Sequence, residues 1–328
     1  MPNGSLIQKL MGLNPHAEMI VRRLYRSSHL HALLRRFKPT DKSRAKAKAS
    51  KANPPPIDFE SVLSHLRKIG VGEGDLLIVH SAYRPLKPSR LSPIEVVEAL
   101  KHLVGEEGTL AMPVIRKFAE SPSEEKALEA DISDITFVYD VDNTPVWTGA
   151  IPKALMKHPD SITSLFPLNT LSAWGPHAEA MMEGNLEGEL PAPNGPQSAW
   201  RYAMDKNAWV VSIGTDLTHS LTAIHTSEDM KRFDWPVEGW YRHKRFRIVV
   251  GDEVQEKVVL ERHPRWGMLH FGERKLCHDL ILQGVMSSDR VEGLVVETLR
   301  AKALYEFLNA RNSNGYPYFW LGSALRKP

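Results

Sequence analysis

The sequence contains almost no cysteine, because Cys277 is the only one among its 328 residues. A single cysteine excludes an internal disulfide and is typical of proteins from a reducing compartment. A nucleophilic thiol needs a lowered pKa, and nothing in the segment Lys275-Leu276-Cys277-His278 requires one. We therefore expect an inert cysteine rather than a nucleophile.

Long apolar runs are also absent. No run approaches the roughly 20 residues that a membrane-spanning helix needs, and the first residues lack the apolar stretch of a secretory signal. We therefore expect a cytoplasmic protein. With 42% apolar and 25% charged residues, the composition is that of a globular protein with a substantial core.

Basic charge is concentrated in one segment. Residues 1–52 hold 12 Lys and Arg against 2 Asp and Glu, so the remaining chain holds 30 basic against 37 acidic residues. The body is mildly acidic, which argues against a nucleic-acid-binding core.

The basic segment predicts an arm. Apolar residues at helical spacing with arginines between them predict a basic amphipathic helix over 20–37. A lysine-rich stretch over 42–51, followed by three prolines, predicts a solvated linker. We interpret residues 1–56 as an arm that contacts a membrane surface or a protein partner, and residues 57–328 as one α/β domain.

The body alternates between helical and strand patterns, which predicts an α/β fold with a mainly parallel or mixed sheet. The acidic residues 116–150 predict loops. The expected helices cover 57–69, 92–104, 149–158, 200–206 and a long final segment 289–310, and the expected strands cover 75–80, 109–114, 209–213 and a hairpin over 243–262 that turns at Gly251.

Residues 208–228 carry the most informative pattern. The apolar run 209–213 predicts a buried strand that ends at Gly214. Proteins with α/β folds bind ligands outside the carboxyl ends of their strands. If 220–230 is helical, His225 and Glu228 share one face. A carboxylate beside an imidazole fixes its tautomer and raises its basicity, so the pair predicts a general base.

Other polar residues gather at the same place. Asp216, Thr218 and His219 form a polar turn after Gly214. Asp216 is a second candidate for orienting the His225 ring, although Asp216 and Thr218 are also residue types that cap turns.

The exit of an earlier expected strand, over 75–80, is also polar. The segment His80-Ser81-Ala82-Tyr83-Arg84 follows it. A histidine at a strand end often satisfies backbone groups, so a structural role for His80 stays open.

Four segments in collinear order resemble the aminoglycoside 3-N-acetyltransferase family, over about residues 57–310. They are GDLLIVHS at 74–81, similar to "GDTLLVHSS"; GEEGTLAMP at 105–113, similar to "GPEGTLVMP"; TPVWTGAI at 144–151, similar to "TRGMGAI"; and 213–228, similar to "LLG…NTSLHLAE".

The resemblance implies a three-layer α/β/α fold with a central mixed sheet, and transfer of an acetyl group from acetyl-coenzyme A to an amino group of an amino sugar, without a metal. His225 matches the histidine usually assigned as catalytic base, and Glu228 matches the carboxylate of the same motif. His80 and Ser81 match the loop that helps to hold the cofactor, and Thr109 matches a strand-end residue nearby.

The remaining site expectations are less specific. Ala82, Arg84 and Thr218 are assigned to cofactor binding. Lys87 and Arg90, together with Arg84, are candidates for the cofactor's phosphates. His219 and Trp147 are assigned to substrate binding.

Two departures bear on the acceptor. Ala82 replaces the family's second serine, and the arm has no counterpart in typical resistance enzymes. We therefore expect a sugar amine of surface-polysaccharide or secondary-metabolite assembly, rather than an antibiotic, as the natural acceptor. A homodimer is also an expectation.

Two other functions remain open. A metal-dependent hydrolase would hold zinc on His80, His219 and His225. A non-catalytic scaffold would use the basic arm to hold a membrane or a partner.

Overall fold

A seven-stranded mixed sheet forms the centre of the computed structural model, which describes residues 12–26, 55–123, 126–232 and 234–321. Its strand order is β4-β5-β2-β1-β6-β10-β9. The strands are β1 (Leu76–Ser81), β2 (Thr109–Pro113), β4 (Ile162–Thr163), β5 (Leu171–Trp174), β6 (Trp209–Ile213), β9 (Met286–Val291) and β10 (Leu294–Arg300). β1 is parallel to β2 and to β6, whereas β5 and β10 are antiparallel to their neighbours.

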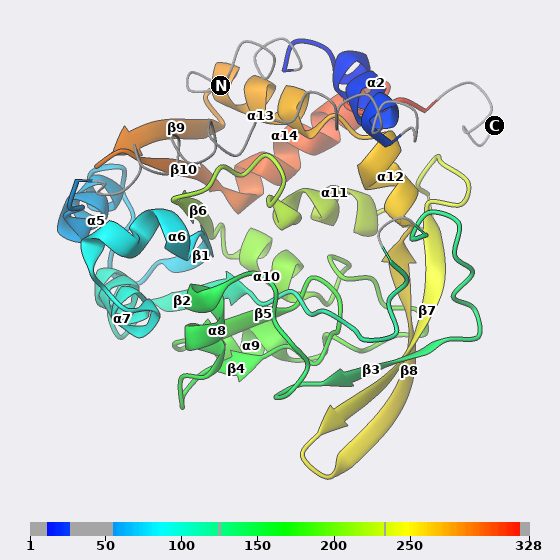
Figure 1. Cartoon of the computed structure of the whole chain (residues 1–328), viewed down its shortest axis with the longest axis horizontal. Helices are drawn as coiled ribbons and strands as arrows, with labels where there is room; N and C mark the ends of the chain where they lie inside the picture. Colours follow the sequence, from blue (N-terminus) through cyan, green and yellow to red (C-terminus); the bar gives the residue numbers. More distant parts are fainter. Residues whose placement is uncertain (1–11, 27–54, 124–125, 233, 322–328) are drawn as a thin grey trace, which may run out of the picture.

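Helices cover both faces of this sheet, so the predicted three-layer α/β/α fold is confirmed (Figure 1). Alternate residues of β1 point to opposite faces: Leu77 belongs to one apolar core and Ile78 to the other. One face packs against α5 (Phe59–Lys68), α7 (Pro93–Val104) and α8 (Ala150–Met156), and the other against α9 (Ala178–Met182), α10 (Ala199–Asp205), α13 (Glu273–Leu282) and α14 (Ala301–Ser313).

Helix α7 illustrates how local sequence sets these boundaries. The Ser92 side chain accepts a hydrogen bond from the Glu95 backbone, and the Glu95 carboxylate accepts one from the Ser92 N–H at 2.8 Å. Pro93 occupies the first turn, where no backbone donor is needed, and Gly105 follows the last residue.

A second, three-stranded sheet stands beside the first, in the order β3-β7-β8. It consists of β3 (Thr136–Asp140), β7 (Tyr241–Val250) and β8 (Glu253–Arg262), over an aromatic cluster that includes Phe118, Phe137 and Phe246. The predicted hairpin is confirmed, with Gly251 in the left-handed region at φ 58°. Strand β3 was missed, because it lies inside the acidic segment that predicts loops.

The expected long helix over 289–310 is wrong. Its first half forms β9 and β10, joined by a turn at Glu292 and Gly293 with φ values of 50° and 77°. Only residues from Ala301 onward are helical, as α14. The spacing of the apolar residues before Ala301 suits a strand as well as a helix. The turn at Gly293 reverses the chain, so these residues form two paired strands instead of one helix.

Near the start of the chain, helix α2 (Pro15–Arg26) packs against α12 (Pro264–Leu269) and α13. The predicted basic helix therefore starts earlier than expected. Its part over 27–37 and the linker over 42–54 lie outside the described residues. No helix in the described part of the chain has the length and apolar character needed to cross a membrane.

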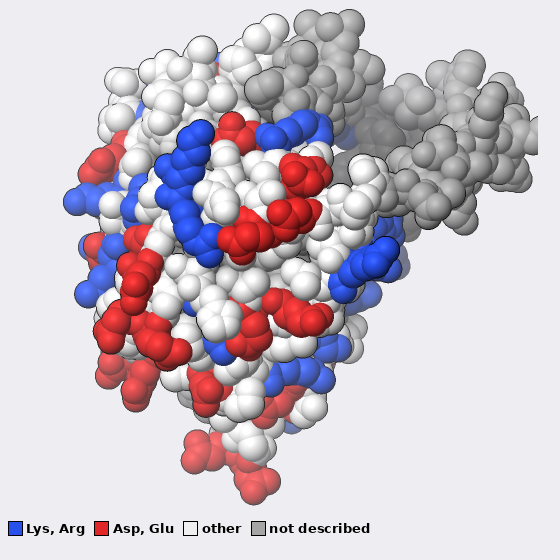
Figure 2. All heavy atoms as spheres, turned by 90° about the vertical axis from the view of Figure 1, so that its left-hand side faces the viewer, with Lys and Arg blue, Asp and Glu red and all other residues white. Residues whose placement is uncertain are grey.

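The surface around α5, α7 and β9 mixes acidic and basic side chains (Figure 2). On this face basic side chains lie beside acidic ones, so the face is not uniformly basic.

Candidate active site

The loops that follow β1 and β6 lie against each other at the carboxyl end of the sheet. The Ala82 N–H donates to the Ile213 carbonyl at 3.1 Å. Gly214 has φ +75°, and a Cβ there would lie 3.1 Å from the Ala82 carbonyl oxygen. A larger residue at 214 would thus meet both backbone strain and a steric contact. β1 lies between β2 and β6, and α/β folds bind ligands at the carboxyl ends of such neighbouring strands.

A side chain of β10 holds the turn after Gly214 in place. Buried Glu297 accepts a hydrogen bond from the Leu217 N–H at 2.7 Å. Exposed Asp216 accepts one from the Thr218 N–H at 3.1 Å. The Asp216 carboxylate therefore caps the turn through the Thr218 N–H and does not contact His225. The expectation that it orients the catalytic ring finds no geometric support.

The segment after the turn carries His225 and Glu228 on a shared face, as expected. His225 ends the 3-10 helix η2 (Thr222–His225), and Glu228 lies in α11 (Thr226–Asp229). The His225 Nδ1 atom is 3.4 Å from Glu228 Oε2.

Helix α11 is short, and buried Asp229 anchors it to two other segments. The Asn194 N–H donates to Asp229 at 2.9 Å, and the Tyr241 hydroxyl donates to it at 2.7 Å. Burial, followed by the charge of Glu228, raises the pKa of Asp229 to about 6.

The structure adds Arg262, which the sequence did not reveal as part of the site. Its guanidinium donates to Glu228 at 3.0 Å and contacts both ring nitrogens of His225, with Nε2 at 2.6 Å. Arg262 ends β8 and pairs with Tyr241 on β7. The hairpin was predicted, but its docking against α11 leaves no local signal in the sequence.

The charges around His225 favour its neutral form. Burial, followed by the positive charge of Arg262, lowers the pKa of His225, although Glu228 acts in the opposite direction. For Glu228, burial alone would raise the pKa, but Arg262 and His225 outweigh it and lower the pKa. A neutral imidazole beside an ionised carboxylate is the protonation state that a general base requires.

A small pocket with a volume of about 20 Å³ opens beside this pair. Its lining comprises His225, Glu228, Trp240, Arg262, Trp266, Gly267, Phe271, Glu273 and Phe319. Aromatic walls with a few converging polar groups are typical of small-molecule sites. A larger cavity of about 580 Å³ lies between residues 128–133 and the start of β7, and His263 lines it, next in sequence to Arg262.

The cofactor loop stands at the carboxyl end of β1. His80 is buried against Trp200, with ring centroids 6.3 Å apart. Its Nε2 atom and the Ser81 Oγ atom are buried without a hydrogen-bond partner among the described residues. The basic side chains of Arg84, Lys87 and Arg90 follow in exposed positions on α6 (Tyr83–Leu86), η1 (Lys87–Ser89) and the residue after them.

Thr109 lies at the other end of the sheet. It begins β2, pairs with Leu76 at the start of β1, and accepts a hydrogen bond from the His177 N–H at 3.0 Å. The structure therefore does not bring Thr109 together with Ser81, and its expected place near the cofactor loop is wrong.

The two expected substrate residues differ in their positions. The half-exposed His219 side chain contacts Glu273, a residue of the pocket wall, and its Nε2 lies 3.0 Å from the Arg274 guanidinium. Trp147 is 67% exposed and does not line the pocket beside His225.

Cysteine and metal chemistry find no support at this site. Cys277 is buried, and this burial raises the pKa of its thiol well above the usual value, which favours the unreactive form. The described part of the chain contains no group of three or more His, Cys, Asp or Glu side chains that could hold a metal ion. His80, His219 and His225 are therefore not gathered as the hydrolase hypothesis requires.

Comparisons with known proteins agree with this architecture. The sequence model of a family described as aminoglycoside 3-N-acetyltransferase matches residues 78–311. Aminoglycoside N(3)-acetyltransferase IV of Salmonella sp is 27% identical over 54% of this chain, and the match spans 60% of that relative's length. Aminoglycoside N(3)-acetyltransferase VIII of Streptomyces fradiae is 25% identical over 77% of this chain and 90% of its own.

A solved structure described as "AAC-IIIb binary with CoASH" has the same fold. It superimposes with a TM-score of 0.63 and 17% identity, and the match covers 78% of this chain and 96% of that chain. About a fifth of the present chain therefore has no counterpart in that structure.

Proposed function

Because the chain belongs to the aminoglycoside 3-N-acetyltransferase family, a family of acyltransferases, we propose that it transfers an acetyl group from acetyl-coenzyme A to an amino group of an amino sugar. The predicted family, fold and class of enzyme are confirmed. The observation that carries the mechanism is the partly buried His225, which is held between Glu228 and Arg262 at the pocket wall and whose pKa is lowered by burial and by Arg262.

The reaction needs a base because an ammonium group has no lone pair. His225 takes the proton from the acceptor nitrogen, directly or through a water, and ionised Glu228 stabilises the imidazolium that forms. The nitrogen attacks the thioester carbonyl, and the N–C bond forms before the C–S bond breaks. In this proposal, backbone N–H groups after Gly214, or in the loop after His80, stabilise the negative oxygen of the intermediate. The proton on His225 then passes to the departing thiolate, and the acylated nitrogen loses its second proton to water as the neutral amide forms. No covalent enzyme intermediate is required.

Arg262 occupies the position on His225 that the acceptor amine must take. A neutral imidazole offers a lone pair on only one ring nitrogen, and a guanidinium can only donate. The acceptor amine and Arg262 therefore compete for the same lone pair of His225. Productive binding requires the acceptor to displace Arg262 from the ring, while Glu228 can continue to hold the guanidinium.

The end of β1 fits the co-substrate. Unpaired Ser81 Oγ and His80 Nε2 atoms offer hydrogen bonds to an entering polar group, and the exposed Arg84, Lys87 and Arg90 offer charge for phosphates. Acetyl-coenzyme A supplies the activated acyl thioester. In this proposal, His80 and Ser81 hold its acyl end and the three cations hold its phosphates.

For the acceptor we propose an amino sugar of surface-polysaccharide or secondary-metabolite assembly. The named relatives are aminoglycoside N(3)-acetyltransferases, and the ionised Glu228 and Glu273 of the pocket suit a cationic sugar. The division into an arm over 1–56 and a domain over 57–328, membrane contact of the arm, a cytoplasmic location and a homodimer remain predictions.

A thiol-release assay with acetyl-coenzyme A tests the proposal. The acceptor panel contains free amino sugars, nucleotide-linked amino sugars and aminoglycosides, and the His225→Ala variant is the control. We expect thiol release with at least one acceptor and a loss of more than about 100-fold in turnover for the variant. An absence of release with every acceptor, together with no heat of acetyl-coenzyme A binding in calorimetry, would instead favour the scaffold function.

A further inference from the structure

The pocket beside His225 is too small for a sugar. Its volume is about 20 Å³, which is room for about one water molecule, whereas sites for small organic ligands typically have about 300–1,000 Å³. The side chains of His225 and Glu228 are only 14% and 4% exposed. An acceptor ring can therefore reach His225 only after part of the pocket wall has moved.

One side of this pocket is closed by three parts of the chain. Gly267 belongs to helix α12, Phe271 follows that helix, and Phe319 comes from near the end of the described chain. Phe271 and Phe319 form an isolated β-bridge, and their ring centroids are 4.8 Å apart. We refer to α12, Phe271 and Phe319 as the cover, since opening the pocket on this side requires them to move.

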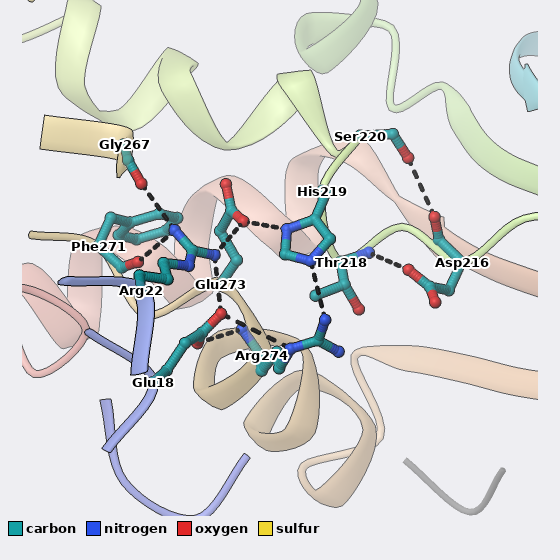
Figure 3. A network of polar contacts seen from close by, with 10 residues as sticks. All are labelled: Glu18, Arg22, Asp216, Thr218, His219, Ser220, Gly267, Phe271, Glu273 and Arg274. Atoms are coloured by element: carbon teal, nitrogen blue, oxygen red, sulfur yellow. Dashed lines mark hydrogen bonds and ion pairs between the residues drawn. The ribbon is translucent and has the colours of Figure 1, made fainter. Parts of the chain in front are cut away.

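Helix α2 is bound to this cover by Arg22. The Arg22 guanidinium donates to the carbonyl oxygens of Gly267 at 2.8 Å and Phe271 at 3.4 Å (Figure 3). It also donates to Glu273 Oε2 at 2.7 Å, on the pocket wall next to the cover. One side chain of α2 therefore joins two parts of the cover to each other and to the body.

Arg23 binds the remaining part of the cover. Its guanidinium donates to the Leu269 carbonyl oxygen of α12 at 3.2 Å and lies 4.1 Å from the ring centroid of Trp320. Trp320 is next in sequence to Phe319, and its N–H donates to the His270 carbonyl oxygen at 2.8 Å. A displacement of α2 would therefore loosen all three parts of the cover.

A buried carboxylate sets the position of Arg22. Glu18 is 1% exposed, accepts from Arg22 at 2.7 Å and accepts from the Arg274 N–H at 3.0 Å. Burial raises the pKa of Glu18, although Arg22 acts in the opposite direction. The pair therefore gives α2 a defined place on the body, but a buried ion pair contributes little net stability.

Apolar packing adds little to the attachment of α2. Among the side chains of α2 that the structure describes, Met19 is fully buried, whereas Ile20 and Val21 are 47% and 44% exposed. A helix with few buried apolar contacts belongs to the elements that open at low free-energy cost. Helix α2 can therefore detach while the body stays folded.

We propose that helix α2 is an autoinhibitory strap: its contacts with the cover hold the pocket beside His225 closed, and its detachment admits the acceptor. This inference rests on the proposed function, because it concerns access of the acceptor to the base. Helix α2 lies outside residues 78–311, which match the family model, so the strap is no part of the matched region.

The strap changes the population of the open form. When only a fraction of the protein is open, the apparent KM for the acceptor is the intrinsic value divided by that fraction. Loosening α2 therefore lowers this KM. Loss of a purely structural support would have the opposite effect or none, so the direction of the change separates the two roles.

The test compares full-length wild type with Arg22→Met in the thiol-release assay. The variant loses the bonds to the cover and leaves the buried Glu18 without its main partner. Loss of these charge-assisted hydrogen bonds should lower KM for the acceptor by about 5- to 50-fold. We expect kcat to change less than about threefold, unchanged acetyl-coenzyme A affinity in calorimetry, and faster hydrogen exchange of the amides of residues 264–272.

Two matched variants exclude other causes. A Cβ at Gly272 would lie 2.7 Å from the Pro15 Cβ, so Gly272→Ala should displace the start of α2 and lower the same KM without changing any charge. Ile20→Ala alters an exposed residue of α2 and should leave KM and the exchange rates unchanged.

The outcomes are distinct for the two proposals. If none of these proteins acetylates any acceptor, the proposed function fails and this inference fails with it. If the wild type is active and Arg22→Met leaves KM unchanged or raises it, α2 is a structural support and the inference alone is overturned. A lower KM for Arg22→Met but not for Gly272→Ala assigns the effect to the lost charge and also overturns the strap. A wild type that is inactive beside active variants supports both proposals.

Discussion

Glu228 offers the sharpest test of the charge balance around His225. Proton transfer creates an imidazolium 3.4 Å from the Glu228 carboxylate, and Glu228 keeps the Arg262 guanidinium close to it. At this distance and an effective dielectric constant of about 20, Glu228 stabilises the imidazolium by about 5 kcal/mol. Arg262 opposes it by a similar amount, so the two residues nearly cancel.

The Glu228→Gln variant removes only the favourable half of this balance. An uncompensated penalty of about 5 kcal/mol corresponds to more than three decades in rate. The Arg262 side chain is 24% exposed and can move toward water, which reduces the penalty. We therefore expect kcat to fall by about 10²- to 10³-fold, measured by thiol release with both substrates saturating.

A double variant tests whether the charges of Glu228 and Arg262 oppose each other at His225. Glu228→Gln combined with Arg262→Met removes both charges, so kcat should recover by at least about tenfold over Glu228→Gln alone. Circular dichroism and the melting temperature check that both variants are folded. The electrostatic account is wrong if Glu228→Gln keeps kcat within threefold of wild type, or if the double variant is no faster than the single one.

Three further predictions follow from single residues. The His225→Gln variant should lose about 10²- to 10⁴-fold in kcat with unchanged acetyl-coenzyme A affinity in calorimetry, whereas exposed His102→Gln should retain both. Burial lowers the pKa of His80 to about 4, so the unfolded chain binds the extra proton below about pH 6.5. The free energy of unfolding should then fall by roughly 3 kcal/mol as the pH drops from 6.5 to 4, and urea titrations of His80→Phe should lack this slope. Gly214→Ala, strained at φ +75° and 3.1 Å from the Ala82 carbonyl, should destabilise by about 1–3 kcal/mol in the same titrations.

The parts of the fold that sequence predicts are those with local causes. The capping box of Ser92 and Glu95 marks the start of α7, and Gly251 marks the turn of the β7–β8 hairpin. His225 and Glu228 were found for the same reason, since three residues along a helix bring them together. In each case the partners are close in sequence, so a short pattern is sufficient.

The failures have a common physical origin in contacts between distant segments. Residues 289–300 have a spacing of apolar side chains that suits a helix, but pairing of β10 with β6 in the central sheet makes them strands. Arg262 lies 34 residues from Glu228 in the chain, and Arg22 lies 251 residues from Glu273. Neither arginine has a neighbour in sequence that would distinguish it from an ordinary surface cation.

The register of one hairpin determines the chemistry of His225. On β7, Tyr241 donates to Asp229 and so fixes α11, while its partner on β8, Arg262, reaches the imidazole held by that helix. Both functions depend on the same residue pair, Tyr241 and Arg262. The turn at Gly251 sets the register of this pair and of all the other pairs between β7 and β8. A slip by one residue would turn the side chain at 262 to the other face of the sheet. It would remove the guanidinium that favours a neutral base, although α11 itself would be unchanged in sequence.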